Sequence, residues 1–243
     1  MTTVIKRPDA HTFVPSNPIC VALDSADRAT IKDLVDATAG HVGMFKIGLT
    51  TFVSTSSDVV REVGAHAPVF LDLKLHDIPM QVSGAVKAAA ETGASMVTIH
   101  ASGGRDMVRA AAEAAPSGLA VLAVTVLTSL DDDALGTIGL AGPAGDAVLR
   151  LADLALQAGA DGLVCSPLEI ERVRARFGAV TDGGPLLVVP GIRPDGGSTQ
   201  DQRRTMSAAA AVEAGADVIV VGRPITGAPD PGAAARAISK ELG

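Results

Sequence analysis

The decapeptides ETGASMVTIH (91–100), LQAGADGLVC (156–165) and VEAGADVIVV (212–221) repeat one local pattern three times along the chain. Each begins with the end of a helix-like segment, continues through Gly and Ala, and finishes in an apolar run. Because glycine adopts the left-handed conformation without steric cost, we expect a helix, a glycine turn and a strand in that order. Three copies indicate an architecture built from a repeated helix–strand unit.

Further apolar runs extend this pattern over the whole chain at intervals of roughly 20 to 30 residues. Stretches between them, such as 27–40 and 146–159, carry apolar residues every three to four positions and end in Gly, as helices do. Near-continuous Val, Ile and Leu favours strands covered on both faces, as in a parallel sheet. Eight such units predict an α/β fold, a closed (β/α)8 TIM barrel rather than an open doubly wound sheet. The eight predicted strand runs are residues 19–24, 44–49, 69–75, 96–101, 121–127, 162–166, 186–192 and 218–224.

Composition limits the classes of protein to which the chain can belong. With 243 residues, 47% of them hydrophobic, we expect a single domain over 1–243, with 1–17 as an irregular N-terminal extension. The net charge of −7 and the scattered Lys and Arg argue against a nucleic-acid partner. No signal-peptide run or long apolar stretch occurs, so we expect a cytoplasmic protein without a membrane partner. Cys20 and Cys165 lie in apolar runs without metal-ligand spacing, and we interpret both as buried thiols.

Charged side chains gather where the predicted strands end, which is where TIM barrels carry their active sites. Side chains two apart on a strand share a face, so Asp72 and Lys74 are expected to meet. Burying such ions costs on the order of several kcal/mol each unless they are paired, so stability alone rarely selects them. We predict a functional network of alternating charges, with a purely structural ion-pair lattice as the alternative. Its members are Asp24, Lys46, Asp72, Lys74 and Asp77.

Asp77 has a second interpretation. It precedes Ile78 and Pro79, and proline is common in the first turn of a helix, so Asp77 is also a candidate N-cap. Capping and catalysis do not exclude each other.

Gly and Arg recur at the ends of the last two predicted strands, in PGIRPDGG (190–197) and VGRPITG (221–227). Glycine lets backbone N–H groups approach phosphate oxygens, and arginine offers a planar fork of donors to a dianion. We therefore predict a phosphate site there. The polar segment PDGGSTQDQ (194–202) is long for a βα loop, as a closing lid would be, and a plain surface loop is the alternative.

Five strings together resemble the bacterial type of the orotidine 5′-phosphate decarboxylase family, in the same order and with comparable spacing from about residue 18 to 235. The Asp-x-Lys-x-x-Asp pattern alone also occurs in related barrels that act on sugar phosphates, whereas the full set is highly specific. The strings are FKIG (45–48), DLKLHDIP (72–79), VTVLTS (124–129), PGIR (190–193) followed by DQRR (201–204), and VGRPIT (221–226).

The resemblance implies decarboxylation of orotidine 5′-monophosphate to UMP and CO2, the last step of de novo pyrimidine synthesis. It further implies a homodimer with shared active sites and no metal or organic cofactor. Lys74 would stabilise the carbanion at carbon 6 and protonate it, with Asp72 beside the departing carboxylate and Asp77 reaching the neighbouring subunit's site. Since the electrons left on carbon 6 lie in the ring plane without a conjugated sink, preorganised charge must lower the barrier.

The same resemblance assigns the substrate contacts. The ribose hydroxyls fall to Asp24 and Lys46, with Lys46 also completing the catalytic network. Thr128 and Ser129 are implied to contact the pyrimidine ring. The implied phosphate contacts are Arg193, Gln202, Gly222 and Arg223. Three further residues are implied to contact the substrate: Ile78, Gln81 and Pro190.

The chain departs from the family pattern in one place, because DIPMQV puts Met80 and Gln81 where the family usually has Asn and Thr. A longer amide therefore replaces a hydroxyl that would contact substrate near the subunit boundary. His76 and His100 are expected to support the site or the core, not to bind a metal. Two other functions stay open. One is a magnesium-dependent sugar-phosphate decarboxylase or aldolase, which needs a further carboxylate at a strand end. The other is a non-catalytic nucleotide-binding barrel.

Overall fold

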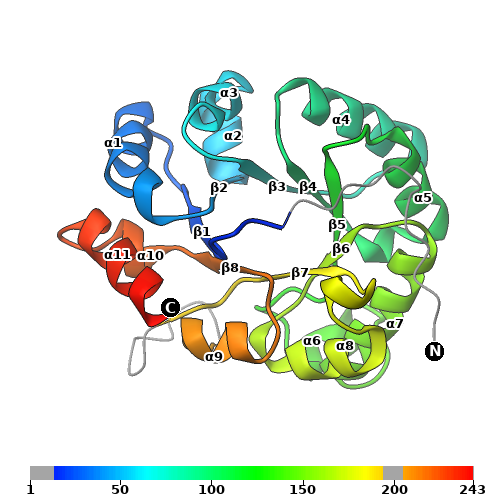
Figure 1. Cartoon of the computed structure of the whole chain (residues 1–243). Helices are drawn as coiled ribbons and strands as arrows, with labels where there is room; N and C mark the ends of the chain where they lie inside the picture. The colour runs from blue at the N-terminus through cyan, green and yellow to red at the C-terminus, as the bar shows by residue number, and fades with distance from the viewer. Residues whose placement is uncertain (1–13, 194–204, 243) are drawn as a thin grey trace.

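Within the residues that the computed structural model describes, 14–193 and 205–242, eight parallel strands close into one barrel (Figure 1). Each strand pairs with the next in chain order, and the last pairs with the first. The predicted (β/α)8 fold is confirmed. The strands are β1 Ile19–Ala22, β2 Met44–Gly48, β3 Val69–Leu75, β4 Met96–His100, β5 Ala120–Val124, β6 Gly162–Val164, β7 Leu186–Val189 and β8 Val218–Val221.

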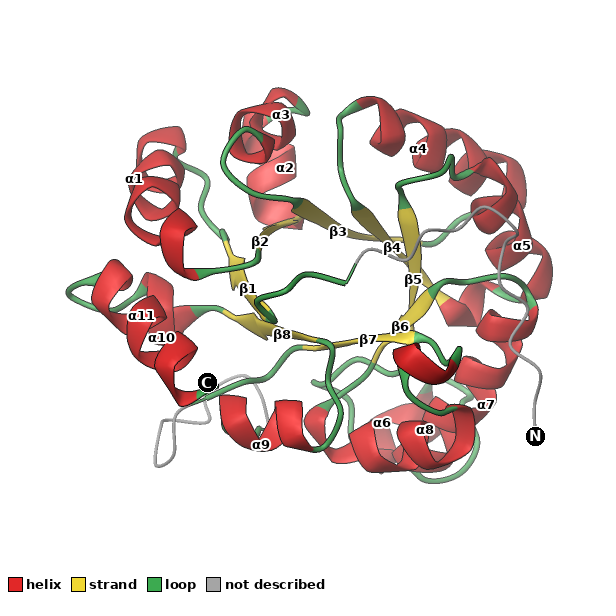
Figure 2. Cartoon of the chain, in the orientation of Figure 1, coloured by secondary structure: helices red, strands yellow, loops and turns green. Residues whose placement is uncertain are grey.

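Helices surround the barrel and cover the outer face of its sheet (Figure 2). They follow the strands in sequence, so that each crossover returns the chain to the same end of the barrel. The α-helices of the described residues are α1 Arg28–Thr38, α2 Leu49–Thr55, α3 Asp58–Gly64, α4 Pro79–Glu91, α5 Arg105–Ala114, α6 Asp132–Thr137, α7 Ala144–Gln157, α8 Ile170–Phe177, α9 Ala208–Glu213, α10 Arg223–Thr226 and α11 Pro231–Glu241. Short 3-10 helices are η1 Ala39–His41, η2 Ala101–Gly103, η3 Pro167–Glu169 and η4 Val180–Asp182.

The repeated glycine turns have the predicted conformation. Gly93, Gly159 and Gly215 have φ angles of 85°, 98° and 110°, in the left-handed region. Each lies between the end of a helix and the start of a strand. The glycine is therefore what allows helix and strand to join over so few residues.

Two aspartates of the same repeat fasten the start of a strand to its neighbour. The Asp161 carboxylate accepts a hydrogen bond from the N–H of Val121, and that of Asp217 accepts one from the N–H of Leu187, each at 2.7 Å. Arg174 of α8 binds Asp217 at 2.5 Å and also donates to backbone carbonyls of neighbouring turns. These contacts hold the amino-terminal end of the barrel together.

The barrel has two apolar layers. Adjacent residues of β1, such as Cys20 and Val21, belong to different buried clusters, because successive side chains of a strand point to opposite faces. The smaller cluster fills the barrel interior and includes Met44, Phe70 and Met96, all at most 1% exposed. The cavity described below lies beyond this packed interior, at the strands' carboxyl ends. Both cysteines are buried and free, as interpreted from the sequence.

The predicted N-terminal extension is described only from residue 14. Residues 14–17 form no helix or strand. The Asn17 amide donates to the carbonyl of His41 at 2.9 Å, and its oxygen accepts from the N–H of Ile19 at 3.0 Å. This short stretch is thus tied to the barrel at the start of β1.

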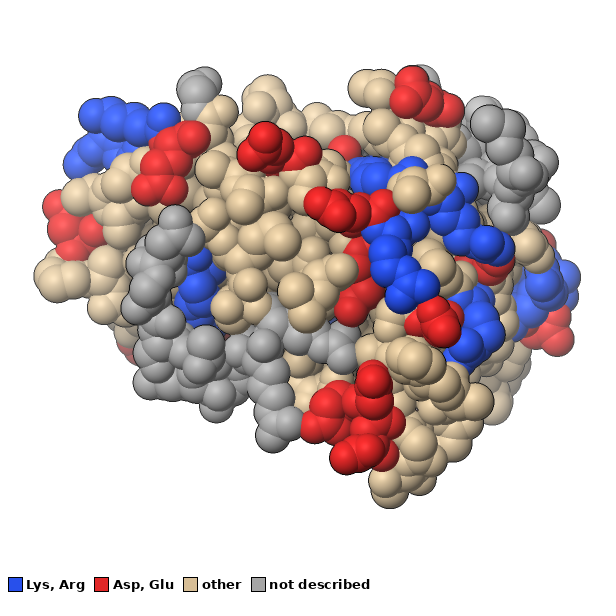
Figure 3. Space-filling model, turned by 90° about the horizontal axis from the view of Figure 1, so that it is seen from below, with Lys and Arg blue, Asp and Glu red and all other residues tan. Residues whose placement is uncertain are grey.

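Charge on the surface is mixed. On the face seen in Figure 3, Lys and Arg side chains lie among Asp and Glu side chains. Between α7 and α8, Arg172 binds Asp146 at 2.7 Å, and Arg176 binds Asp153. In the described part of the chain, none of the helices combines the length and apolar character that crossing a bilayer requires.

Candidate active site

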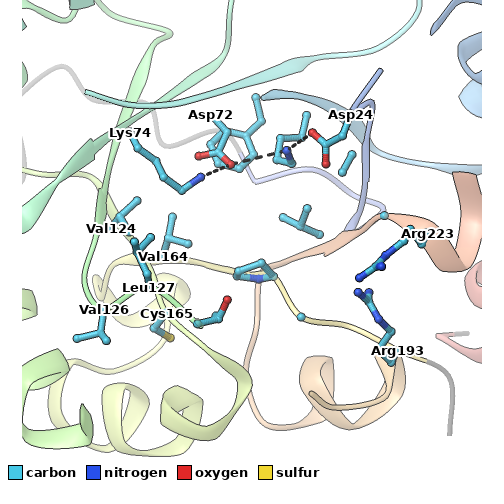
Figure 4. A pocket seen from close by; sticks show the side chains of 18 of the residues that line it. Asp24, Asp72, Lys74, Val124, Val126, Leu127, Val164, Cys165, Arg193 and Arg223 are labelled. Atoms are coloured by element: carbon cyan, nitrogen blue, oxygen red, sulfur yellow. Dashed lines mark hydrogen bonds and ion pairs between the residues drawn. The ribbon is translucent and has the colours of Figure 1, made fainter. Parts of the chain in front are cut away.

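A cavity of about 540 Å³ lies at the carboxyl ends of the strands, a volume typical of small-molecule sites. Nine of the predicted site residues line it. Asp24, Asp72 and Lys74 lie along one side with Lys46 between the carboxylates, and Arg193 and Arg223 lie together, away from Lys74 (Figure 4). Gly222, Thr128 and Pro190 also belong to the cavity wall.

Four charges alternate along one side of this cavity. Lys46 Nζ donates to Asp24 Oδ1 at 2.9 Å and lies 3.8 Å from Asp72 Oδ2. Lys74 Nζ donates to the same Asp72 oxygen at 2.7 Å. The side chains of Lys46 and Asp72 are only 11% and 12% exposed. The structure therefore brings four members of the predicted network together, and each charge has an opposite neighbour.

The electrostatics of this row keep its buried ammonium charged. Burial by itself would lower the pKa of Lys46, but the negative charges of Asp72 and Asp24 outweigh burial and raise that pKa above its ordinary value. Cys20 lies close to the row, and burial raises the pKa of its thiol although Lys46 opposes the shift. Cys20 is thus a neutral thiol near two carboxylates.

Strand β3 has an irregularity where it enters the site, which the alternation of side chains along a strand does not predict. Leu71 pairs with Val97 and Leu75 with Ile99, so four residue steps on β3 are matched by two on β4. Lys74 lies in this bulge with a φ of 51°, a left-handed conformation that is rare for a residue with a side chain. The expected contact between Asp72 and Lys74 is present, but a bulge and not a flat strand produces it.

Two residues that our reading of the sequence missed support the row. Thr98 of β4 is fully buried, and its hydroxyl contacts both the Asp72 carboxylate and the Lys74 backbone. Gly48 ends β2, and a Cβ there would lie 2.8 Å from Asp24 Oδ1 and 2.9 Å from Lys46 Nζ. The available signals were a threonine inside an apolar strand and the glycine of the FKIG string.

A third missed residue supports the loop that carries Asp24. The buried hydroxyl of Thr51 in α2 bonds to the carbonyls of Leu23 and Ser25, the latter at 2.9 Å. The N–H of Ser25 donates back to it at 3.2 Å. The hydroxyl therefore holds the backbone of the residues immediately before and after Asp24.

The part of the cavity away from Lys74 carries two arginines. The guanidinium groups of Arg193 and Arg223 project there and point toward one another (Figure 4). Arg193 is positioned by its N–H, which donates to the carbonyl of Met206 at 2.9 Å. Two neighbouring cations favour an anion between them. Gln202 and the rest of the predicted lid from residue 194 lie outside the described residues.

Four predicted residues are not among the described residues that line the cavity. Asp77, Ile78, Gln81 and Ser129 are exposed, and no ion pair joins Asp77 to Lys74 within the described chain. The Asp77 carboxylate accepts from the N–H of Ile78 at 2.6 Å. The N-cap of α4 is Ile78, which makes no side-chain cap. The N-cap interpretation of Asp77 is therefore wrong by one position, because its carboxylate binds the adjacent amide and not one in the first turn.

Two histidines lie beside the row of charges. The rings of His76 and His100 are 5.3 Å apart and tilted by 35°. Burial lowers the pKa of His100, and the positive charges of His76 and Lys74 lower it further to a smaller extent. Within the described residues, no group of three or more His, Cys, Asp or Glu side chains is arranged to hold a metal ion.

Comparison with known proteins agrees with this geometry. Residues 17–238 match the model of the orotidine 5′-phosphate decarboxylase / HUMPS family. The chain belongs to this family. The family predicted from the sequence strings is thereby confirmed, and with it the class of enzyme.

Relatives and solved structures of the family cover nearly the whole chain. The orotidine 5′-phosphate decarboxylase of Anaeromyxobacter dehalogenans strain 2CP-1 is 55% identical over 94% of this chain and 99% of its own length. That of Thermobifida fusca strain YX is 52% identical over 93% and 95%. The crystal structure of orotidine 5′-phosphate decarboxylase from Lactobacillus acidophilus superposes with a TM-score of 0.82, at 36% identity, over 94% of this chain and 100% of that one.

Proposed function

We propose that the protein decarboxylates orotidine 5′-monophosphate to UMP and CO2 in this cavity, with Lys74 as the proton donor and without a cofactor. Family membership and the relatives' names support the reaction and its place in pyrimidine biosynthesis. The observation that carries the mechanism is the Lys74 ammonium, bound to Asp72 at 2.7 Å on the wall of a cavity whose far end holds two arginines.

The chemistry needs a positive charge at the reacting carbon. When the bond from carbon 6 to the carboxylate breaks, CO2 leaves and the electron pair stays on carbon 6 in the ring plane. A neighbouring ammonium stabilises that charge as it develops and then transfers a proton to carbon 6, which gives UMP and a neutral amine. The Lys74 amine regains its proton from solvent. Asp72 keeps the ammonium aimed, at no cost in reorganisation during the step.

The remaining charges divide the substrate between them. Asp24 and Lys46 hydrogen-bond the ribose hydroxyls, Thr128 contacts the pyrimidine ring, and Arg193 and Arg223 bind the phosphate with the backbone of Gly222. Their shared cavity, with the two arginines lying together away from Lys74, supports this division. Binding energy released at the phosphate then contributes to the barrier at carbon 6, because it holds the ring in register with Lys74.

A metal-free reaction fits the partners that the carboxylates already have. Asp24 is bound by Lys46, and Asp72 is bound by Lys74 with Lys46 nearby. The lysine ammonium groups occupy the positions from which a cation would act on the substrate. The magnesium-dependent alternative requires a carboxylate that accepts a metal at this wall.

The deciding experiment follows loss of orotidylate absorbance and formation of UMP, with and without a chelator. Lys74→Ala is compared with wild type and with Lys87→Ala, an exposed lysine of α4 away from the cavity. We expect a chelator-insensitive wild type, a normal Lys87→Ala, and a loss of about 10²- to 10⁴-fold for Lys74→Ala. Near-normal turnover of Lys74→Ala contradicts the mechanism. Chelator inactivation that magnesium reverses supports the sugar-phosphate alternative, and binding without UMP formation supports the non-catalytic one.

We also propose that the working unit is a homodimer with shared sites. Apolar side chains are exposed beside the carboxyl ends of β2 and β3, with Ile78 60% and Met80 74% exposed. Val53 of α2 is 80% exposed. A second copy of the chain covers these side chains, and Asp77, Ile78 and Gln81 then reach the cavity of that second copy. This explains why they do not line the cavity of their own chain.

Mixing two inactive variants tests the shared site. Lys74→Ala and Asp77→Ala subunits are dissociated, combined and reassembled. Random pairing leaves about a quarter of the sites with both native residues, so activity returns to about a quarter of the wild-type value. Mixed subunits that regain nothing, together with a monomeric mass by sedimentation, contradict the proposal.

A further inference from the structure

We propose that Thr98 is a positioning residue for the decarboxylation: its buried hydroxyl sets the Asp72 carboxylate and the Lys74 backbone relative to each other. The inference deepens the proposed function and rests on the role of Lys74 as proton donor. Thr98 belongs to β4, is fully buried and is not part of the cavity wall, so it acts through its two neighbours.

The hydrogen bonds of this hydroxyl have only one consistent direction. The Thr98 oxygen accepts the N–H of Lys74 at 2.8 Å. An amide N–H only donates, so the single hydroxyl proton is left for Asp72 Oδ1 at 2.9 Å. The hydroxyl therefore links a backbone donor to a carboxylate acceptor, with neither group left unpaired in the buried bulge.

Each oxygen of the Asp72 carboxylate then has its own task. Oδ1 accepts from the Thr98 hydroxyl, and Oδ2 accepts from Lys74 Nζ at 2.7 Å with Lys46 Nζ 3.8 Å away. A carboxylate held by one oxygen can still rotate about its terminal bond, but one held by both cannot. Thr98 thus fixes the direction from which Asp72 presents its charge to the Lys74 ammonium.

The same contact supports the unusual backbone of Lys74. Between the paired residues Leu71 and Leu75, β3 leaves the regular ladder with β4. Lys74 has a φ of 51°, a conformation that surrounding contacts must hold in place. Its N–H is satisfied by a side chain of the neighbouring strand and not by a carbonyl of the ladder. One hydroxyl therefore anchors both ends of the Lys74 residue, directly at the backbone and through Asp72 at the ammonium.

Loss of this anchor has a particular kinetic signature. The ribose and phosphate contacts come from other strands, so substrate binding stays close to normal. The ammonium, however, is no longer held against carbon 6, and a displacement of about 1 Å lowers the chemical rate on the order of 100-fold.

The test compares Thr98→Val, which keeps the shape but removes the hydroxyl, with Thr98→Ser, which keeps the hydroxyl. Thr38→Val is the matched control, because Thr38 is equally buried and donates one hydrogen bond to the carbonyl of Leu34, away from the cavity. We measure kcat and KM for orotidylate, and the dissociation constant of UMP. We expect Thr98→Val to lower kcat about 10- to 100-fold with KM and UMP binding within about threefold. Thr98→Ser restores most of kcat, and Thr38→Val is normal.

The inference is overturned if Thr98→Val keeps wild-type kcat, or if Thr98→Ser is as impaired as Thr98→Val. If Thr98→Val does not fold, Thr98→Ser and Thr98→Ala give the same comparison, since they differ only in the hydroxyl. Lys74→Ala, assayed in parallel, distinguishes failure of the proposed mechanism from failure of the proposed role of Thr98. An active Lys74→Ala refutes the proposed mechanism itself, whereas an inactive Lys74→Ala beside a normal Thr98→Val refutes only the role of Thr98.

Discussion

Substitution of Gly48 by alanine is expected to damage turnover while leaving the fold intact. The new methyl group lies 2.8 Å from Asp24 Oδ1 and 2.9 Å from Lys46 Nζ, where ordinary contacts begin at 3.4 Å. These two atoms are the ends of one hydrogen bond of 2.9 Å. Each has to retreat by about half an ångström, so the methyl group separates the pair.

The magnitude follows from what that hydrogen bond contributes. A hydrogen bond to a charged group is worth about 1.5–3 kcal/mol. The Asp24 side chain is 56% exposed and can be solvated again, which reduces the loss to about 1–2 kcal/mol. That free energy corresponds to a decrease of roughly 5- to 30-fold in kcat/KM. Stability changes little, because Lys46 keeps Asp72 as a neighbour at 3.8 Å.

The assay is steady-state decarboxylation of orotidylate, paired with a thermal melt. Gly84→Ala serves as the control, because Gly84 lies inside α4 and a Cβ there meets nothing within 4 Å. That variant should keep full activity and gain about 0.5–1 kcal/mol of stability. Wild-type kcat/KM in Gly48→Ala, or an equal loss in Gly84→Ala, would refute the steric reasoning.

Three other perturbations follow from contacts in the described residues. Arg174→Met leaves the Asp217 carboxylate, 13% exposed, without its cation, so urea denaturation should show a loss of about 3–5 kcal/mol; a loss below about 1 kcal/mol contradicts this. Burial holds the pKa of His100 below 6.5 in the folded protein, so as the pH falls its imidazole is protonated in the unfolded chain before it is in the folded one. Stability therefore falls as the pH drops below 6.5. His100→Asn should therefore melt with a smaller difference between about pH 7.5 and 5.5 than wild type, and equal differences speak against it. Arg223→Ala should lower kcat/KM by about 10-fold or more and reduce kcat as well as affinity; steady-state kinetics with unchanged kcat would rule out the coupling.

The fold could be predicted from sequence because its signals are local. Each of the eight strands begins at the start of an expected apolar run or one residue before it, and the glycine turns are left-handed as expected. Strand ends were less predictable. Several runs were expected to extend further, but residues such as Leu23 and Ile192 leave the regular strand although they are buried. Apolarity marks burial, whereas the end of the ladder depends on where the partner strand stops.

The site was predictable in its charges but not in its supports. Charged residues at strand ends are conspicuous, so Asp24, Lys46, Asp72 and Lys74 could be grouped before any coordinates. A lysine in the left-handed region carries no signal in its residue type, and Thr98 looks like any β-branched residue of a strand. The bulge and its threonine become visible only when two strands are placed side by side.

Asp77 illustrates a different limit. Its residue type and position in the string suggested a role, yet among the described residues its carboxylate accepts a hydrogen bond only from the neighbouring amide. A role that depends on a second copy leaves no trace in the contacts of a single chain.

The aspartates that join neighbouring strands, Asp161 and Asp217, lie at the opposite rim from the cavity. Sequence drift in the loops of the reactive rim therefore leaves this fastening untouched. A lineage can exchange one loop at a time and acquire a new substrate while the closed cylinder persists. Such independence of the two rims explains how one barrel has been inherited by enzymes of divergent specificity.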